Sequence, residues 1–130
     1  MDFDYTVSTK KLFDEAVAAV EARSKENGFG VLHVHDVKAT LAAKGFDREP
    51  LKIIEICNSK FAYEALKRDM SVSLFMPCKI NVYTENGRTK IKAMRPAAIA
   101  DFLPGAGLET LAAEIDRVVI EIVDRAAKGK

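Results

Sequence analysis

Residues 53–83 read IIEICNSKFAYEALKRDMSVSLFMPCKINVY, and the rest of the chain is arranged around them. An apolar run ends at Cys57 and Asn58, a short amphipathic segment follows, and Pro77 and Cys78 interrupt a second apolar run. Short apolar runs are typical of strands, whereas the spacing of the middle segment is typical of a helix. Both cysteines of the protein therefore lie at or near the ends of expected strands.

The order of the expected elements indicates the fold class. Strands are expected over residues 3–7, 30–37, 51–57 and 72–76, with a hairpin of residues 80–93 that turns at 85–87. Helices are expected over residues 9–27, 37–43, 59–70 and 107–128, with a structured loop over 96–107. Because the last strands pair in a hairpin, this order favours an α+β fold: one twisted, mostly antiparallel sheet with helices packed mainly on one face.

Short polar side chains mark where these helices begin. The expected N-caps are Ser8 or Thr9 for the first helix, Asp36 for the second, and Asn58 or Ser59 for the third. Asn27-Gly28 is expected to end the first helix, because glycine readily adopts the left-handed conformation of a helix C-terminus. Pro77 requires an edge, a bend or a bulge in the strand that begins at residue 72.

Length, charge and cysteine count limit the possible functions. At 130 residues the chain is expected to form a single domain spanning 1–130. Its 20 basic and 19 acidic residues give a net charge of +1, so charge gives no reason to expect nucleic acid or a membrane as a partner. We find neither a signal peptide nor an apolar run of about 20 residues. Because two cysteines cannot make a disulfide scaffold, we expect a cytoplasmic protein with free thiols and no cofactor.

Several spaced motifs resemble one known family. They are Asp36-Val37-Lys38-Ala39-Thr40-Leu41; Ile53-x-Glu55-x-Cys57-Asn58 followed by Ala62, Ala65 and Leu66; and Leu74-x-x-Pro77-Cys78 followed by Val82-Tyr83. Together and in this order they resemble the domain of unknown function 302 family over residues 5–96. The resemblance implies a TATA-binding-protein-like α+β fold, in which helices back a curved antiparallel sheet, and a tendency to form homodimers. It implies no settled biochemical role.

The chain departs from the family pattern at its C-terminal end. Residues 97–130 extend past the usual hairpin as a loop and a long helix, and residues 105–107 are expected to be a hinge between the two. Family members often carry an acidic residue just before the proline that follows the hairpin, and this chain has Arg95 there. A site that needs a carboxylate at that position would lack it.

The candidate ligand-binding residues are Glu55, Cys57, Asn58 and Cys78. Glu55 and Cys57 are two apart on a strand, so their side chains project from the same face, with Cβ atoms ~7 Å apart. Cys78 approaches them if its strand neighbours theirs. Strand parity places Cys78 on the face of Ile80, unless Pro77 shifts the register.

Three functions remain open for these residues. The first is a homodimeric protein that binds a small ligand, thiol-reactive or sulfur-containing, in a pocket lined by them. The second is a thiol or redox enzyme with Cys57 or Cys78 as nucleophile and Glu55 or a histidine as base. The third is a structural or interaction module in which both cysteines are small buried apolar side chains. If Glu55 is buried, its pKa should rise, and Lys79 or Arg68 would be its partner.

His33 and His35 form a separate candidate metal site. On the strand of residues 30–37, Val31, His33 and His35 are expected on one face and Leu32 and Val34 on the other. Two imidazoles at this spacing can chelate a metal ion, and with one or two thiolates they would make a zinc or copper set. The sequence has no CxxC or HxxxH pair, so a pair of solvent-facing histidines is the alternative.

Overall fold

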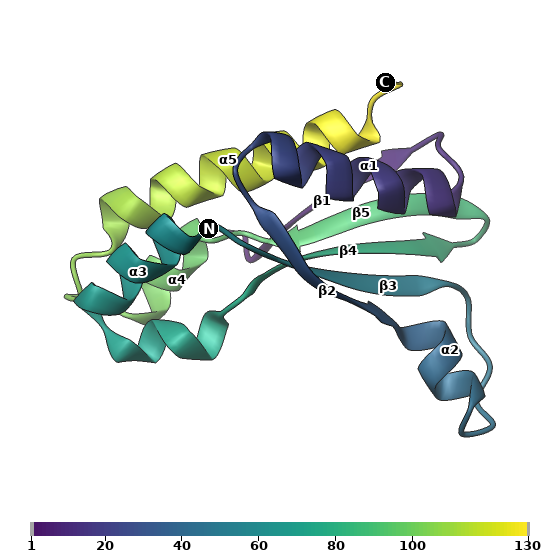
Figure 1. The fold of residues 1–130 in the computed structure, drawn as a ribbon, viewed down its shortest axis with the longest axis horizontal. Helices are drawn as coiled ribbons and strands as arrows, with labels where there is room; N and C mark the ends of the chain where they lie inside the picture. Colours follow the sequence, from purple (N-terminus) through teal and green to yellow (C-terminus); the bar gives the residue numbers. More distant parts are fainter. Residues whose placement is uncertain (1, 130) are drawn as a thin grey trace.

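The computed structural model describes residues 2–129, and within them five strands form one sheet (Figure 1). The strands are β1 (Asp4–Thr9), β2 (Gly30–Asp36), β3 (Leu51–Cys57), β4 (Cys78–Glu85) and β5 (Arg88–Met94), in the spatial order β1-β5-β4-β3-β2. The helices are α1 (Phe13–Glu26), α2 (Val37–Ala42), α3 (Ser59–Arg68), α4 (Ala97–Phe102) and α5 (Glu109–Ala127), with a 3₁₀ helix η1 (Met70–Phe75). Every pair of neighbouring strands is antiparallel, which confirms the expected α+β class.

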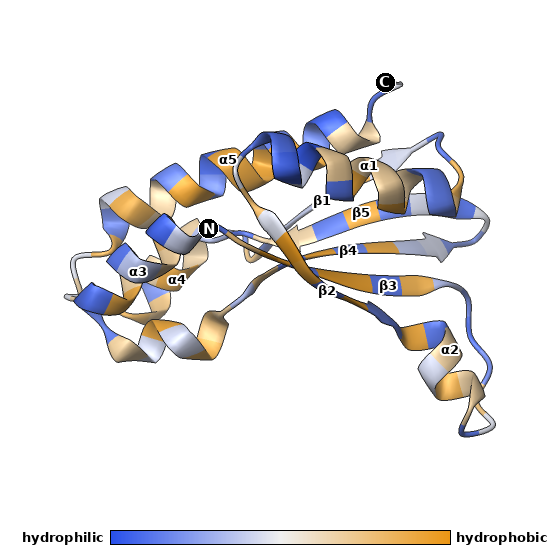
Figure 2. Ribbon diagram, in the orientation of Figure 1, coloured by the Kyte–Doolittle hydropathy of each residue, from blue (hydrophilic) through white to orange (hydrophobic). Residues whose placement is uncertain are grey.

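The main core lies between one face of the sheet and the helices α1 and α5, which lie side by side over it (Figure 1). Hydrophobic and hydrophilic residues alternate along both helices, as their amphipathic spacing requires (Figure 2). The large side chains buried in this layer include Val20, Ile54, Ile56, Ile80, Val82, Ile91, Ile122 and Val123. Burial of each contributes ~1.5–3 kcal/mol, so this layer is the main source of folding free energy.

The opposite face of the sheet carries mainly polar side chains, and we call it the open face. Along β3 and β4 its members alternate with the buried isoleucines and valines of the main core. They include Glu55 on β3, Lys79 and Asn81 on β4 and Lys92 on β5.

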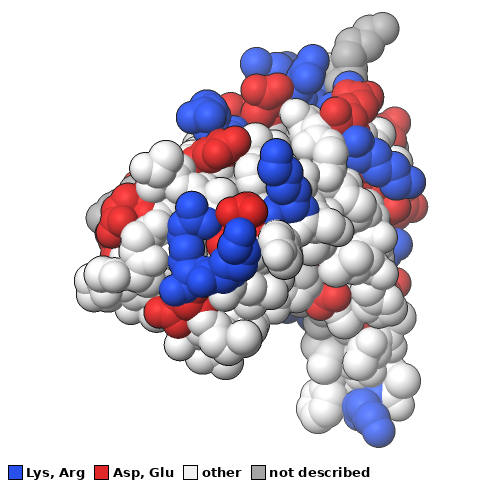
Figure 3. Space-filling model, turned by 60° about the vertical axis from the view of Figure 1, so that its left-hand side comes forward, with Lys and Arg blue, Asp and Glu red and all other residues white. Residues whose placement is uncertain are grey.

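A second, smaller apolar core lies beyond one end of the sheet. There α3, η1 and α4, which we call the cap, pack against the first turns of α5 (Figure 1). Its buried members are Ala65, Val72, Leu108 and Leu111. Seen from the cap side, one group of basic side chains has acidic side chains beside it, and further basic side chains are spread over the rest of this face (Figure 3). No helix among the described residues is both long and apolar enough to cross a membrane.

A largely buried ion pair joins the sheet to α5. Arg95, which follows β5, donates from Nη2 to Asp116 Oδ2 at 2.8 Å and from Nε to Oδ1 at 3.3 Å. The backbone N–H of Ala97 donates to the same Oδ1 at 3.1 Å. Asp116 is only 5% exposed, so these donors replace the water that its carboxylate loses on folding. A carboxylate from α5 thus lies beside the position where the family often has an acidic residue.

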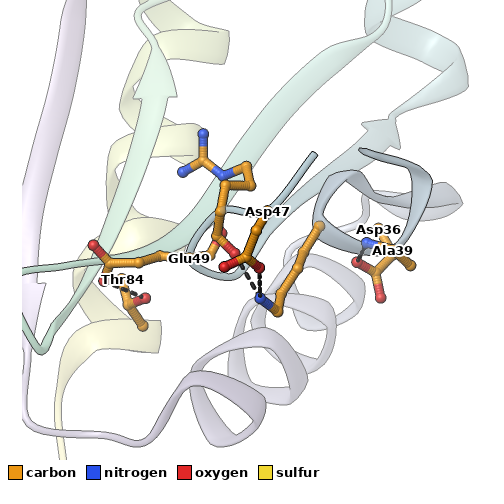
Figure 4. A network of polar contacts seen from close by, with 7 residues as sticks. Asp36, Ala39, Asp47, Glu49 and Thr84 are labelled. Atoms are coloured by element: carbon orange, nitrogen blue, oxygen red, sulfur yellow. Dashed lines mark hydrogen bonds and ion pairs between the residues drawn. The ribbon is translucent and has the colours of Figure 1, made fainter. Parts of the chain in front are cut away.

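Polar contacts hold the connection between α2 and β3 at the far end of the sheet (Figure 4). Lys38 Nζ donates to the carbonyl oxygen of Arg48 at 2.6 Å and lies 3.4 Å from Asp47 Oδ1. Thr84 Oγ1 on β4 donates to Glu49 Oε1 at 3.2 Å. These groups are exposed, so the contacts position the connection more than they stabilise the fold.

Three local predictions are confirmed. The hairpin between β4 and β5 turns at Asn86 and Gly87, whose φ angles of 55° and 78° are the positive values that such a turn requires. The Asp36 side chain caps α2 by accepting from the backbone N–H of Ala39 at 2.9 Å. Gly28 adopts a φ of 82° just after α1, as its place at the helix C-terminus predicts.

The expected strand over residues 72–76 is wrong, because this segment forms η1. Asp69 Oδ1 accepts the backbone N–H of Ser71 at 2.8 Å and caps the 3₁₀ helix. Val72 and Phe75 are three apart, which is the period of a 3₁₀ helix, and both point toward the cap interior, whereas Leu74 is 83% exposed. The alternation of Val72, Leu74 and Met76 resembles a strand only by coincidence. Within the expected loop over 96–107, residues 97–102 form the short helix α4.

Two further expectations also require correction. A register shift between Val31 and His33 places Val31 opposite Ile56 and Val34 opposite Ile54, so Val31 and Val34 share the main-core face of β2. Neither Ser8 nor Thr9 caps α1, because both remain paired in β1. The helix begins after Leu12, whose backbone N–H donates to the side chain of Glu15 at 2.9 Å.

We predict that Asp116→Ala lowers the free energy of unfolding by about 2–4 kcal/mol, because it leaves Arg95 and an amide N–H without their acceptor. Glu121→Ala is the matched control: it removes a carboxylate from the same helix, but one in an exposed pair with Arg125. It should cost less than ~0.5 kcal/mol. Urea unfolding of the two variants measures both values, and equal losses would contradict a structural role for Asp116.

Candidate functional site

An apolar pocket lies in the seam between the two cores. It encloses about 70 Å³ where β3 ends and β4 begins, beneath the cap. Its apolar wall includes Ile56 from the sheet, Phe61, Ala65, Val72, Phe75 and Ile99 from the cap, and Leu111, Ala112 and Ile115 from α5. The pocket exists because side chains of two layers meet here without interdigitating fully.

Three of the four candidate residues line this pocket. Cys57 is the last residue of β3, Asn58 follows it, and Cys78 is the first residue of β4. Antiparallel pairing places Cys78 directly opposite Ile56, so Cys78 faces the main-core side of the sheet. The alternation of side chains along the strand predicted this face for Cys78. Cys57 reaches the same pocket from the strand end, and the two cysteines are free thiols.

The Asn58 side chain joins three segments at this end of the sheet. Its Oδ1 accepts the backbone N–H of Phe61 at 3.0 Å and so caps α3, as the sequence predicts. Its Nδ2 donates to the carbonyl oxygen of Gly28 at 3.1 Å, just before β2. Asn58 therefore fixes both the exit of β3 and the direction in which the cap begins.

Burial controls the ionisation of Cys78. It raises the pKa of this thiol to about 11, and the neighbouring Cys57 raises it further, while Lys79 acts in the opposite direction. At neutral pH Cys78 is therefore a protonated thiol and a weak nucleophile.

Glu55 lies apart from the pocket, on the open face. Its Oε2 accepts a hydrogen bond from His35 Nε2 at 2.9 Å, and Lys79 lies directly opposite it on β4. The hydrogen bond from His35, followed by the positive charges nearby, lowers the pKa of Glu55. This is the reverse of the rise expected for a buried carboxyl. Arg68, the other suggested partner, contacts Glu64.

His33 and His35 share the open face of β2, with ring centroids 4.4 Å apart in an edge-to-face arrangement. In the part of the chain that the structure describes, no group of three or more His, Cys, Asp or Glu side chains is placed to hold a metal ion. Cys57 and Cys78 are among the residues that line the pocket, whereas neither His33 nor His35 lines it. Metal binding by the histidine pair stays a prediction.

Sequence reasoning missed the cap side of the pocket. Phe75 and Met76 line it, yet the mistaken strand over 72–76 gave them no defined place. The lining residues of α5 belong to its expected apolar stripe, but nothing in that stripe says which of its members face a cavity. The three-residue spacing of Val72 and Phe75 is the signal that could have revealed η1.

These features define an α+β domain with a small apolar pocket at one end of its antiparallel sheet. The chain belongs to the DUF302 family: the family model described as "Domain of unknown function DUF302" matches residues 5–126, a range that includes most of α5. The chain is similar to the crystal structure of an uncharacterized conserved DUF302 protein from Bacillus stearothermophilus, with 35% identity and a TM-score of 0.92. That match covers 97% of this chain and 99% of the other. No protein among those with curated functions matches the chain.

We predict that Asn58→Ala costs about 1–2 kcal/mol of stability, because it removes both the cap of α3 and the bond to Gly28. Asn58→Ser keeps an acceptor suited to capping but is too short to reach Gly28. It should recover about half of the loss. Thermal unfolding compares the two variants, and equal destabilisation would show that the helix cap contributes nothing.

We also predict slow alkylation of Cys78 by iodoacetamide. With a pKa of about 11, only about 1 in 1,000 Cys78 thiols is ionised at pH 8, and the rate should rise about tenfold per pH unit up to pH 10. Peptide mass spectrometry follows Cys78 separately from Cys57. A rate that levels off near pH 9 would mean that the thiol is not buried as described.

Proposed function

We propose that this protein binds a small thiophilic ligand in the pocket at the end of its sheet, with Cys57 and Cys78 as the contacting groups. The observation that carries the proposal is that two free cysteines from neighbouring strands are among the residues that line one apolar pocket. Sulfur is the most polarizable donor in proteins, and both cysteines present it where few other polar groups compete for the ligand.

The volume of the pocket restricts the ligand to a few heavy atoms. Drug-sized ligands occupy pockets of roughly 300–1,000 Å³, and an engineered cavity of about 150 Å³ already binds benzene. At about 70 Å³ this pocket takes something smaller, unless the cap moves outward.

The apolar wall of the pocket disfavours a charged organic group, or an ion that sulfur binds weakly, because the water it loses would not be replaced. The small volume of the pocket and its apolar wall together support a small ligand with affinity for sulfur.

The geometry supports binding more strongly than thiol catalysis. A nucleophilic cysteine acts as a thiolate, whereas the pKa of Cys78 is raised to about 11. Glu55 and the histidines, the suggested bases, lie on the open face and do not line the pocket. We therefore place the enzyme hypothesis second.

The proposal has two further parts, the cellular compartment and a homodimer, which rest on less direct observations. Free thiols suit a reducing compartment such as the cytoplasm. A homodimer would cover some of the exposed apolar side chains of the cap, among which Met70, Leu74 and Phe102 are each more than half exposed.

The test compares two substitutions in adjacent positions of α5. Ala112 lines the pocket and is 6% exposed, whereas Ala113 lies on the outer surface. With methylmercury(II) as the thiophilic probe, Ala112→Leu should slow uptake at least about tenfold, because a filled pocket must open first, at a cost of ~1.4 kcal/mol or more. Ala113→Leu should react as the parent protein does. Intact-protein mass spectrometry measures the uptake.

Either of two results would overturn the proposal. Equal uptake rates in both variants would mean that the thiols are reached from outside the pocket. A parent protein that takes up no probe would favour a structural or interaction module instead. Thermal unfolding confirms that each variant is folded, since overpacking costs about 1–3 kcal/mol.

A further inference from the structure

Sulfur atoms gather at the seam between the two cores. Of the two cysteines and four methionines in the chain, Cys57, Met76 and Cys78 line the pocket. Met94 and Cys78 line a smaller recess beside it, of about 60 Å³. Met76 follows η1 and Cys78 begins β4, so two residues of the segment 76–78 line the pocket. The proposed function uses only the two thiols of this group.

We propose that Cys57, Met76 and Cys78 bind one Cu(I) ion, which makes the ligand of the proposed function a soft monovalent metal. Thiolate and thioether donors select Cu(I), whereas magnesium, calcium and manganese require oxygen ligands. Among the residues that the structure describes, no Asp, Glu or His lines the pocket. Structural zinc normally takes four cysteine or histidine ligands, and the wall offers only two.

The surroundings of the three sulfur atoms favour Cu(I) over Cu(II). Cu(II) prefers a square-planar set of nitrogen and oxygen ligands, which this wall cannot supply. Apolar side chains of the cap and α5 make up most of the wall around these residues, so few hard ligands lie near a bound ion. Asn58, the polar side chain on the wall, already uses its Oδ1 and Nδ2 in hydrogen bonds.

Binding is a ligand exchange without a redox step. The two thiols lose their protons to water, two copper–thiolate bonds form, and the thioether of Met76 donates a lone pair as the third ligand. The bound centre carries a net charge of −1.

The histidine pair does not take part in this site. His33 and His35 lie on the open face, where Glu55 holds His35 through its Nε2. A copper set that combined these imidazoles with the thiols would require both groups to reach one point, and the sheet separates them.

Competitive titration tests the assignment. Reduced protein is titrated with Cu(I) under nitrogen in the presence of bicinchoninate, which reports free Cu(I) by its colour. One Cu(I) per chain is expected, with the affinity lowered about 100-fold or more by Cys57→Ser or Cys78→Ser and about tenfold by Met76→Leu. Met70→Leu is the matched control, because Met70 begins η1 but is 71% exposed, and it should bind as the parent does.

Each outcome separates this inference from the proposed function. Methylmercury uptake without Cu(I) binding would overturn the copper assignment and leave the proposed function standing. Cu(I) binding that Met76→Leu and Met70→Leu leave equally strong would remove Met76 from the site and overturn the three-sulfur set. A protein that neither takes up methylmercury nor binds Cu(I) would overturn both proposals. Thermal unfolding without metal confirms that each variant is folded.

Discussion

The architecture of the candidate site depends on the place where β3 stops. Asn58 ends the strand and begins α3, and its amide also bonds to Gly28 before β2. This single side chain therefore sets the direction of the cap relative to the sheet. Because β4 begins beside this point, Cys57 and Cys78 lie beneath the cap. Without this turn the cap would have no fixed place over the strand ends.

The pocket lies where two apolar cores meet, and Phe61 and Ile115 pack against both of them. The main core fills the space between the sheet and α1 and α5, while the cap packs its own side chains against the start of α5. The pair of Arg95 and Asp116 fixes the second connection, where β5 leads into α4. With the cap held at both ends, the seam cannot simply collapse, and a small cavity persists beside the sulfur atoms.

Strand parity, helix spacing and capping chemistry predicted most of the fold from the sequence. Asn58 as an N-cap, the turn at Asn86 and Gly87, and the facing of Cys78 all followed from local rules. The candidate site could be predicted less well from the sequence, because the alternation of side chains along a strand places Cys57 on the same face as Glu55. In the structure Glu55 lies on the open face while Cys57, at the strand end, lines the pocket. The register shift in β2 and the 3₁₀ helix η1 depend on tertiary packing, so periodicity alone did not reveal them.

The central claim is that the two cysteine side chains meet in one pocket although simple alternation would separate them. Anomalous diffraction from native sulfur atoms in a crystal of the reduced protein locates these atoms directly. We expect the anomalous peaks of Cys57, Met76 and Cys78 to surround a single cavity under the cap. A Cys57 peak on the open face beside Glu55, with the sheet between it and Cys78, would contradict this account.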